Sequence, residues 1–327
     1  MKGKKVLVTG SSGFIGTHLV KELKARGAWV RGVDITNPRY LPQVADQFIR
    51  LDLRLPSDAF MAFATGQSQR MMAFDYVFDL AADMGGMGHI LSHHASIATH
   101  NNQINTNVSG GVRKWCPDAT YVYTSSACAY PDYRQLDADS TPLREEEVLP
   151  ADPQGGYGWQ KLFHEQVLGY YRDSGEMDVQ IVRFHNAYGP YAKYEGGREK
   201  VIAALCRKVI EAKAENRHDI EIWGDGEQVR SFMYASDTVT GLLLVALQGD
   251  GHPTNVGSED AVTINALADV VSNVAGWPIK KKHVPGPQGV RGRNSDSTKV
   301  KRLGWRQQVS LHDGVERTYR WIKKQLV

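Results

Sequence analysis

Short apolar segments alternate with longer, amphipathic ones over the first half of the chain. The apolar segments have the length of buried strands, and they lie at residues 4–9, 28–34, 75–81, 120–125 and 178–184. A helix from about Phe14 to Arg26 follows the first of them, and another helical segment separates the third from the fourth. Strands that alternate with helices predict an α/β fold with a doubly wound parallel sheet.

Beyond Tyr188 the pattern is less regular, and it predicts loops that face a ligand. We expect a loop or lid at 189–200, a helix at roughly 199–213, a hairpin turn at 224–232, a helix near 236–248, a strand of the main sheet at 254–258, and a second substrate-facing loop at 283–296. The division is therefore discontinuous. The predicted larger domain is 1–188 plus about 231–275, and the smaller one is about 189–230 plus 276–327.

The composition is that of a globular protein. The chain has 327 residues, 42% of them hydrophobic, which suffices for a large core. Its 39 basic and 36 acidic residues form no long basic block, which argues against nucleic-acid binding. We see no apolar signal segment and no run of about 18 apolar residues, so we expect a soluble, cytoplasmic protein without a membrane partner. The sparse cysteines lack CxxC spacing and predict no disulfide.

A glycine-rich turn (GSSGFIG) separates the first strand from the first helix. Its first glycine permits the tight turn, its second lets the backbone approach a pyrophosphate, and its third allows the helix to pack closely on the strand. The N-terminus of the helix then faces the phosphates. We therefore expect a dinucleotide site that includes Gly10, Gly13, Phe14, Ile15 and Gly16.

Two carboxylates at strand ends are candidates for the same site. Asp34 ends the second strand, where a carboxylate accepts both ribose hydroxyls and repels a 2′-phosphate, so NAD is favoured over NADP. Asp52 ends another predicted strand. It either contacts adenine or caps a turn, and the sequence favours neither.

Tyr157 and Lys161 form a YxxxK pair on one face of a predicted helix. A lysine beside a tyrosine stabilises the phenolate and lowers a pKa that begins at about 10. Tyr157 is then a suitable base for an alcohol proton while hydride leaves the same carbon. Ser125 or Ser126, at a strand end, is placed to hold the reacting hydroxyl, and we favour Ser126. No metal site is expected.

These features resemble the extended short-chain dehydrogenases that act on nucleotide sugars, the NAD-dependent epimerase/dehydratase family. Within it, GDP-mannose 3,5-epimerases have similar segments in the same order: LAADMGGMG, SSACAYP, YGWQKL, RFHNAYGP, GGREK, WGDGEQVRSF and PGPQGVRGRNSD. The resemblance implies a Rossmann domain with a smaller C-terminal substrate domain, bound NAD, a GDP-mannose or related GDP-sugar substrate, and a homodimer. It implies oxidation at C4, epimerisation at C5 and C3, and re-reduction, to give GDP-L-galactose and GDP-L-gulose.

The resemblance also implies roles for single residues. Tyr157 and Lys161 would carry out the redox steps at C4, and Cys128 and Lys200 would be the acid/base pair at C3 and C5. The residues that would contact the GDP-sugar are Gly85, Ser126, Cys128, Asn186, Glu199, Lys200, Lys208, Gln228, Arg230 and Arg293.

The chemistry of epimerisation agrees with such a pair. A C4 ketone acidifies the C–H bonds at C3 and C5, so one group must remove a proton from one face while another delivers a proton to the opposite face. Cys128 lies two residues beyond Ser126, and nearby cations such as Arg198 and Lys200 favour a thiolate. In an ordinary Rossmann protein, by contrast, this cysteine would simply pack in the core.

Other functions also fit parts of the sequence. A nucleotide-sugar 4-epimerase would use Tyr157 and NAD but would not need Cys128 and Lys200. A 4,6-dehydratase would have an acidic residue near Ala127. A catalytically silent NAD-binding protein would have no chemical need for Tyr157 and Lys161.

The sequence departs from the family pattern at His89, where a phenylalanine is usual, at the start of the KYEGGREK segment, and in the longer stretch 57–72. His89 and His93 have the spacing of a metal-binding pair, but we find no acidic or cysteine partner and expect surface or packing roles. Asn101 or Asn102 either steadies an active-site water or caps a helix. Residues expected in the core or an interface are Trp115, Trp223, Trp277 and Trp305.

Overall fold

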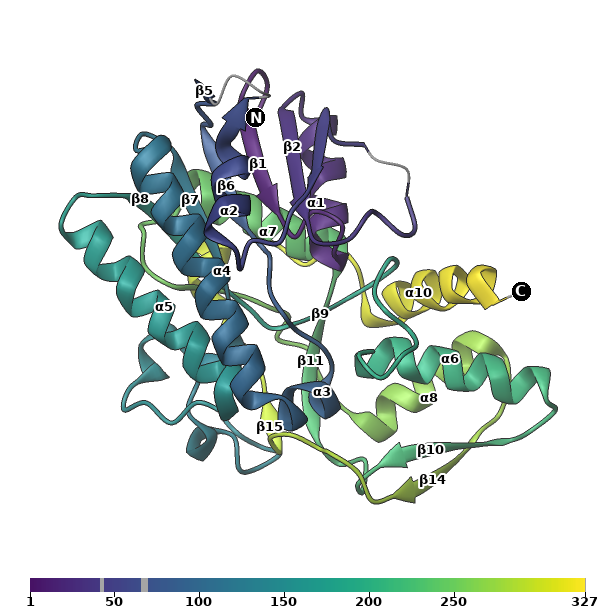
Figure 1. Cartoon of the computed structure of the whole chain (residues 1–327). Coiled ribbons are helices and arrows are strands. Elements are labelled where there is room, and N and C mark those ends of the chain that lie inside the picture. Colours follow the sequence, from purple (N-terminus) through teal and green to yellow (C-terminus); the bar gives the residue numbers. More distant parts are fainter. Residues whose placement is uncertain (42–43, 66–69, 327) are drawn as a thin grey trace.

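A seven-stranded parallel sheet forms the larger part of the computed structural model, which describes residues 1–41, 44–65 and 70–326 (Figure 1). The strand order is β12-β8-β7-β6-β1-β2-β3. The strands are β1 (Lys5–Thr9), β2 (Trp29–Asp34), β3 (Gln47–Arg50), β6 (Tyr76–Asp79), β7 (Thr120–Ser126), β8 (Asp178–Phe184) and β12 (Thr254–Val256). The chain runs outward from β1 through β2 to β3 and then returns to β6 on the other side of β1, so the order reverses beside β1.

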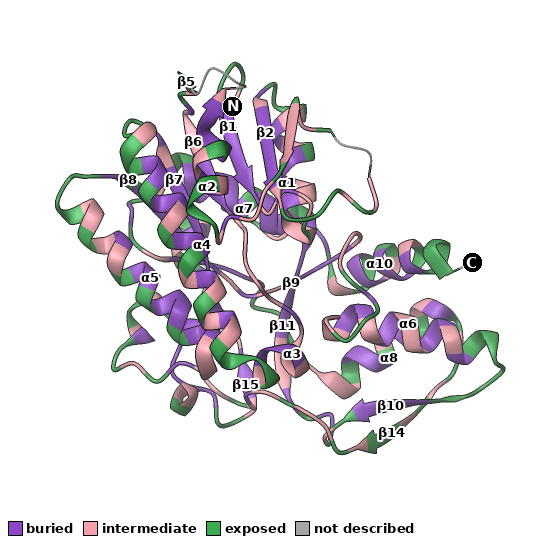
Figure 2. Ribbon diagram, viewed as in Figure 1, coloured by how far each residue is buried: buried purple, intermediate pink, exposed green. Residues whose placement is uncertain are grey.

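Helices cover both faces of this sheet, as the alternating pattern predicts. One face carries α1 (Phe14–Ala25), α7 (Ala235–Gln248) and α9 (Thr298–Arg302), and the other carries α2 (Pro56–Phe63), α4 (His94–Trp115) and α5 (Gly155–Asp173). Along β1, Val6 and Val8 join the first of these cores, while Leu7 joins the second. Successive side chains of a strand point to opposite faces, so a strand buried on both sides must be apolar throughout. Figure 2 shows these strands as mostly buried.

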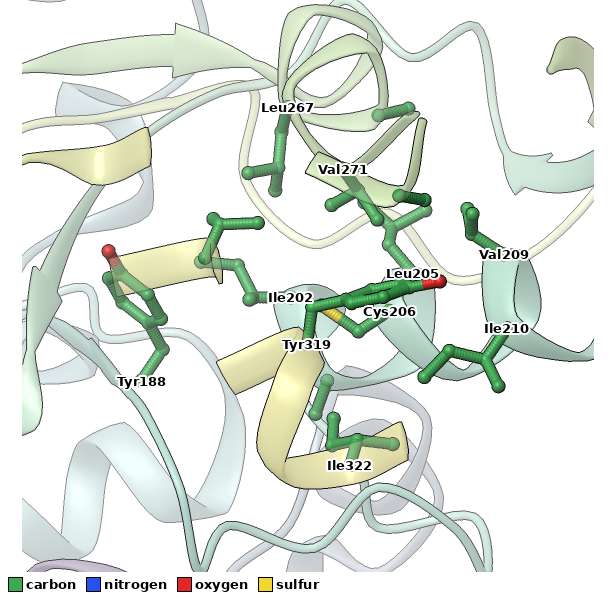
Figure 3. Packing of buried hydrophobic residues seen from close by; sticks show 14 of the residues in the cluster. Tyr188, Ile202, Leu205, Cys206, Val209, Ile210, Leu267, Val271, Tyr319 and Ile322 are labelled. Atoms are coloured by element: carbon green, nitrogen blue, oxygen red, sulfur yellow. The ribbon is translucent and has the colours of Figure 1, made fainter. Parts of the chain in front are cut away.

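Smaller strands and helices make up the second part of the molecule. Strand β11 (Val229–Tyr234) pairs with β9 (Asn186–Tyr188), β13 (Ala261–Thr263) and β15 (Gly292–Arg293), and β10 (Asp219–Trp223) pairs with β14 (Lys280–Val284). Helices α6 (Val201–Ala214), α8 (Ile264–Ala275) and α10 (Leu311–Leu326) enclose an apolar core around Cys206 (Figure 3). The remaining short elements are α3 (Met87–Ser92), β4 (Ala64–Thr65) and β5 (Arg70–Met71).

The predicted hairpin at 224–232 is wrong. Gly224 and Gly226 both have φ of +74° and do form a tight turn. The strands that flank the turn nevertheless belong to different sheets, because β10 takes its partner from Lys280–Val284 and β11 takes partners from three other segments. Those partners lie far away in the sequence, so a local turn signal cannot reveal them.

The domain boundaries stay a prediction, but the hydrophobic cores show which segments pack together. Leu267 and Val271 of α8 belong to the core that α6 and α10 enclose, although the segment was expected with the larger domain. Val300 of α9 and Trp305 belong to the core of the parallel sheet, although they were expected with the smaller one. The core contacts favour moving both segments across the boundary.

A buried ion pair fixes α5 to the sheet. Arg183 of β8 donates to Glu165 of α5 at 2.6 Å, and both side chains are at most 2% exposed. Ser125 of β7 donates its hydroxyl to the same carboxylate. Removing one partner of a buried pair typically costs about 3–5 kcal/mol, because the other charge is left without compensation. The contacts therefore set the position of α5 relative to the ends of β7 and β8.

Within the described residues, no helix has both the length and the apolar character needed to cross a membrane. Of the longer stretch 57–72, residues 66–69 lie outside the described part, and its beginning forms most of α2.

Candidate active site

The glycine turn lies at the point where the strand order reverses, which is where open α/β sheets bind ligands. Gly10 has φ of +65°, and a Cβ on Gly16 would lie 2.0 Å from the carbonyl oxygen of Gly10, so neither position has room for a side chain. The buried hydroxyls of Ser11 and Ser12 have no hydrogen-bond partner within the described residues. A close-packed turn with unpartnered polar groups fits a pyrophosphate, as the sequence predicts.

Asp34 lies directly beside this turn. Its Oδ2 accepts a hydrogen bond from the backbone N–H of Ser12 at 3.0 Å, and its Oδ1 accepts one from the N–H of Thr36 at 2.9 Å. A carboxylate at this strand end suits the ribose diol of NAD and repels a 2′-phosphate.

The carboxylate of Asp52 already accepts hydrogen bonds from within the protein. It accepts from the backbone N–H of Arg54 at 3.1 Å and from the guanidinium of the same residue. This hydrogen bond lowers the pKa of Asp52. The contacts match the turn-capping alternative, and a contact with adenine stays a prediction.

Tyr157 and Lys161 lie on the same face of α5, as their spacing predicts. The pKa of Tyr157, however, is not lowered as expected. Lys161 Nζ donates to the carbonyl oxygen of Thr124 at 2.8 Å and lies 5.8 Å from the centre of the Tyr157 ring. Burial lowers the pKa of Lys161 to about 8 and raises the pKa of Tyr157 above its ordinary value. The expected lowering of the tyrosine pKa is thus absent in the protein alone, because burial raises this pKa and Cys128 adds to the rise.

The two strand-end serines point in different directions. Ser125 donates to the buried Glu165 and is part of the framework. Ser126 hydrogen-bonds to Tyr157, which favours the phenolate form, and its Oγ also accepts the backbone N–H of Cys128 at 3.1 Å. This arrangement supports Ser126 as the residue that holds a reacting hydroxyl.

Cys128 lies next to Tyr157 and faces three cationic side chains from the other part of the chain. It is 8% exposed and packs with Tyr157 in a small apolar cluster. Arg293 Nη1 donates to its Sγ at 3.3 Å, and Lys200 and Arg230 interact with it electrostatically. Positive charge around a thiol favours the thiolate, which is the basic and nucleophilic form. The structure therefore brings together the predicted acid/base pair, Cys128 and Lys200.

Lys200 reaches this site from a loop. Helix α6 begins at Val201, one or two residues later than expected, so Lys200 has an extended backbone just before it. Burial lowers the pKa of Lys200, and Cys128 opposes that shift. A lowered pKa makes the neutral amine more accessible, which suits a lysine that takes up and releases a proton.

Three of the predicted substrate residues keep a buried polar atom without a partner among the described residues. They are Glu199 (Oε2), Gln228 (Oε1) and Arg293 (Nη2). Buried polar atoms in folded proteins are nearly always hydrogen-bonded, so three unpartnered ones point to a ligand that supplies the missing contacts.

The other predicted substrate residues have partners within the protein. Asn186 Nδ2 donates to the carbonyl oxygen of Ser231 at 3.0 Å, and Arg230 donates to the carbonyl oxygen of Val229 at 2.7 Å. Burial lowers the pKa of Arg230 to about 9. Gly85 lies close to a histidine side chain, since a Cβ there would be 2.9 Å from Cβ of His89.

Trp223 was expected in the core or an interface, but 48% of it is exposed. Lys208 Nζ lies 6.0 Å from the centre of its ring, and Gln228 Nε2 donates to its carbonyl oxygen at 3.4 Å. One predicted substrate residue therefore lies over the exposed ring of Trp223, and another bonds to its backbone. The expectation holds for Trp305, which is 1% exposed.

The expectation that the histidines lack an acidic partner is wrong. Asp83 accepts a hydrogen bond from His89 and another from His100. No group of three or more potential metal ligands occurs within the described residues. Asn101 lies inside α4 rather than at its end, so it does not cap the helix, and it bonds the backbone of Asp83.

The order of these elements and the geometry of the site match a known family. Residues 6–257 match the sequence profile described as the NAD dependent epimerase/dehydratase family. The chain belongs to this family. NAD is therefore its cofactor, and the geometry of the glycine turn and of Asp34 fits it.

Individual relatives narrow the comparison. The chain is 37% identical to GDP-mannose 3,5-epimerase of Arabidopsis thaliana, over 98% of this chain and 83% of the plant protein. It is 29% identical to a probable GDP-L-fucose synthase of Oryza sativa subsp. japonica, over 100% of this chain and 94% of that protein. A crystal structure of UDP-glucose 4-epimerase from Thermotoga maritima, with UDP-glucose, matches 99% of this chain and 100% of its own at a TM-score of 0.85 and 26% identity.

The glycine turn yields a direct test of the cofactor site. Gly16→Ala places a Cβ 2.0 Å from the Gly10 carbonyl, so the turn must move and the purified variant should hold much less NAD than the wild type. Gly110→Ala is the matched control, because a Cβ there meets nothing within 4 Å and alanine favours a helix by about 0.5–1 kcal/mol. NAD released on denaturation is measured for both. Equal NAD content in Gly16→Ala would contradict the assignment.

Proposed function

We propose that this chain is a GDP-mannose 3,5-epimerase that produces GDP-L-galactose, with GDP-L-gulose when C5 alone is inverted. The observation that carries the proposal is the placement of Cys128 between Tyr157 and Lys200. The likeness to the Arabidopsis enzyme supports GDP-mannose as the substrate.

The first step is oxidation at C4. NAD, when bound, would supply the acceptor for the C4 hydrogen and the donor for its return, so no net oxidation results. Tyr157 takes the proton of the C4 hydroxyl, and Ser126, which is hydrogen-bonded to Tyr157, orients that hydroxyl. Lys161 supplies positive charge beneath the tyrosine ring and is itself held by the carbonyl oxygen of Thr124.

Proton exchange at C5 and C3 follows oxidation. The C4 ketone acidifies both positions, and inversion requires removal of a proton from one face and delivery to the other. Cys128 and Lys200 come from different parts of the chain, which suits two groups that act on opposite faces of one sugar ring. Arg293 donates to Cys128 Sγ and holds this side chain in place.

A 4-epimerase does not need this pair. Inversion at C4 alone requires only that the ketone present its other face to the cofactor, so Cys128 and Lys200 would have no proton to move. For this reason we favour the 3,5-epimerase over the 4-epimerase.

Two variants separate the redox step from the proton transfers. Cys128→Ala, mixed with GDP-mannose, should still form reduced nicotinamide, because Tyr157 and Ser126 remain, but it should give no epimerised product. Tyr157→Phe should lose both, since a general base contributes roughly 10²–10⁴-fold in rate. Absorbance of the nicotinamide and chromatography of the nucleotide sugars measure the two steps.

Cys116→Ala is the matched control, because Cys116 is a buried cysteine in the core of the parallel sheet. It should form product at the wild-type rate. Wild-type product from Cys128→Ala would return Cys128 to a packing role and contradict the proposal.

We further propose that the enzyme is a homodimer formed through α5. Trp159, Phe163 and Tyr170 are 49%, 59% and 70% exposed, and their spacing places them on one side of this helix. α5 lies beside α4 at the outer edge of the molecule (Figure 1). A stripe of large apolar side chains in water is unfavourable, and a second copy of the chain covers it symmetrically.

Phe163→Glu should therefore convert the dimer to a monomer, because it places a charge in the apolar interface. Leu247→Glu is the matched control, since Leu247 is 44% exposed on α7 at the other face of the sheet. Light scattering after size exclusion gives the molar mass of each. A wild-type monomer, or a Phe163→Glu dimer, would contradict this interface.

A further inference from the structure

Asp83 is the centre of a polar cluster that the proposed mechanism does not use. Its carboxylate accepts hydrogen bonds from His89 Nε2 at 3.2 Å, His100 Nδ1 at 3.0 Å and Arg198 Nη1 at 3.1 Å. Asn101 holds the backbone of Asp83 in place, accepting its N–H at 2.7 Å and donating to its carbonyl oxygen at 3.2 Å. The side chain of Asp83 is 20% exposed, so it is largely withdrawn from solvent. The carboxylate is thus rigidly placed, with three donors directed at it.

Arg198 belongs to the loop that carries Lys200. Its ion pair with Asp83 links this loop to the segment that follows β6. A backbone contact reinforces the link, because the N–H of Gly86 donates to the carbonyl oxygen of Arg198 at 3.1 Å. The two segments are closely packed there, since a Cβ on Gly86 would lie 2.3 Å from the carbonyl oxygen of Glu199. Backbone and side chain together fix residues 198–200 against the larger part of the molecule.

Lys200 needs such an anchor. It precedes α6, with φ of −86° and ψ of 161°, and no side chain caps the helix at this point. One helical hydrogen bond reaches its backbone, from the N–H of Ala204 to its carbonyl oxygen at 3.0 Å, but residues 198 and 199 lie outside the helix. An acid/base group must be held within a fraction of an ångström of its productive position, so further contacts are needed on that side.

We propose that Asp83 is a positioning residue for Lys200. Through Arg198 it holds residues 198–200 so that the lysine faces Cys128, and His89 and His100 hold the carboxylate in turn. This inference rests on the proposed function, because the position of Lys200 affects catalysis only if Lys200 moves a proton of the substrate.

Charge and hydrogen-bond polarity make the carboxylate difficult to replace. Asparagine has the same shape as aspartate, but one of its oxygens becomes an NH₂ group, which is a donor directed at other donors. It also leaves the Arg198 guanidinium without its counter-charge. Asp83→Asn therefore tests the interaction with little change in volume.

A second ion pair attaches the same loop and supplies a control. Arg39 bonds to Glu195 at 2.8 Å, but these side chains are 59% and 46% exposed, and Glu195 is further from Lys200 along the chain. Exposed pairs of this kind contribute about 0–1 kcal/mol. Arg39→Gln removes a loop contact of the same type without touching Asp83.

The experiment uses the full chain with bound NAD and GDP-mannose in heavy water. Two rates are measured for each variant: formation of reduced nicotinamide, and uptake of solvent deuterium into the sugar. Asp83→Asn and Arg198→Gln should slow deuterium uptake roughly 10- to 100-fold, the cost of an ångström-scale misplacement, and leave nicotinamide reduction nearly unchanged. Arg198→Lys should recover much of the loss, and Arg39→Gln should behave like the wild type.

The results distinguish the inference from the function on which it rests. Unchanged deuterium uptake in Asp83→Asn and Arg198→Gln would overturn the inference, and so would an equal slowing of both steps, which would place Asp83 in the cofactor site. A failure of Arg198→Lys to recover activity would also count against an ion-pair role. Absence of deuterium uptake in the wild-type protein would instead contradict the proposed function.

Discussion

The proposed chemistry depends on a single juxtaposition, in which three cationic side chains lie around one buried thiol and one of them bonds to it. Lys200, Arg230 and Arg293 all face Cys128, and burial lowers the pKa of both Lys200 and Arg230. Positive charges that are gathered out of water repel one another and lose hydration, so their clustering is unfavourable without a compensating negative charge. The pyrophosphate of a nucleotide-sugar substrate would provide that charge. The site is therefore electrostatically incomplete in the protein alone and suited to an anionic ligand.

The rest of the fold serves to hold the two sides of this contact together. Cys128 follows directly from the end of β7, whose position relative to α5 is fixed by Ser125 and the buried pair of Glu165 and Arg183. The same helix carries Tyr157, so the redox group and the thiol are set by one rigid unit. The cations come from loops and strands of the second part of the molecule, where the backbone link from Gly86 to Arg198 sets the distance.

Local sequence motifs predicted the cofactor side of the site and the position of the Tyr157–Lys161 pair well. The strand, glycine turn and helix at the cofactor site follow from spacing and residue type alone, because Gly10 has a positive φ and Gly16 packs directly on the turn. The YxxxK pair was likewise placed on one face of a helix. Resemblance to a family supplied Lys200 and Arg293, which no periodicity would have found.

Long-range contacts account for what the sequence did not reveal. The partners of Asp83 include Arg198, which lies in the second part of the molecule, and β10 pairs with a strand that begins only at Lys280. The pKa of Tyr157 also depends on burial, which a sequence does not state, and here burial raises it. Such properties arise only when the chain is folded, so the catalytic balance of the site could not be derived from motifs.

The position of isotope in the product tests the central claim most directly. Wild-type protein is incubated with GDP-mannose in heavy water, and the product is examined by NMR. Proton transfer through Cys128 and Lys200 predicts deuterium at C5, or at both C5 and C3, and none at C4, because the C4 hydrogen leaves and returns as hydride. An epimerised product without deuterium at C3 or C5 would contradict the account and indicate inversion at C4 alone.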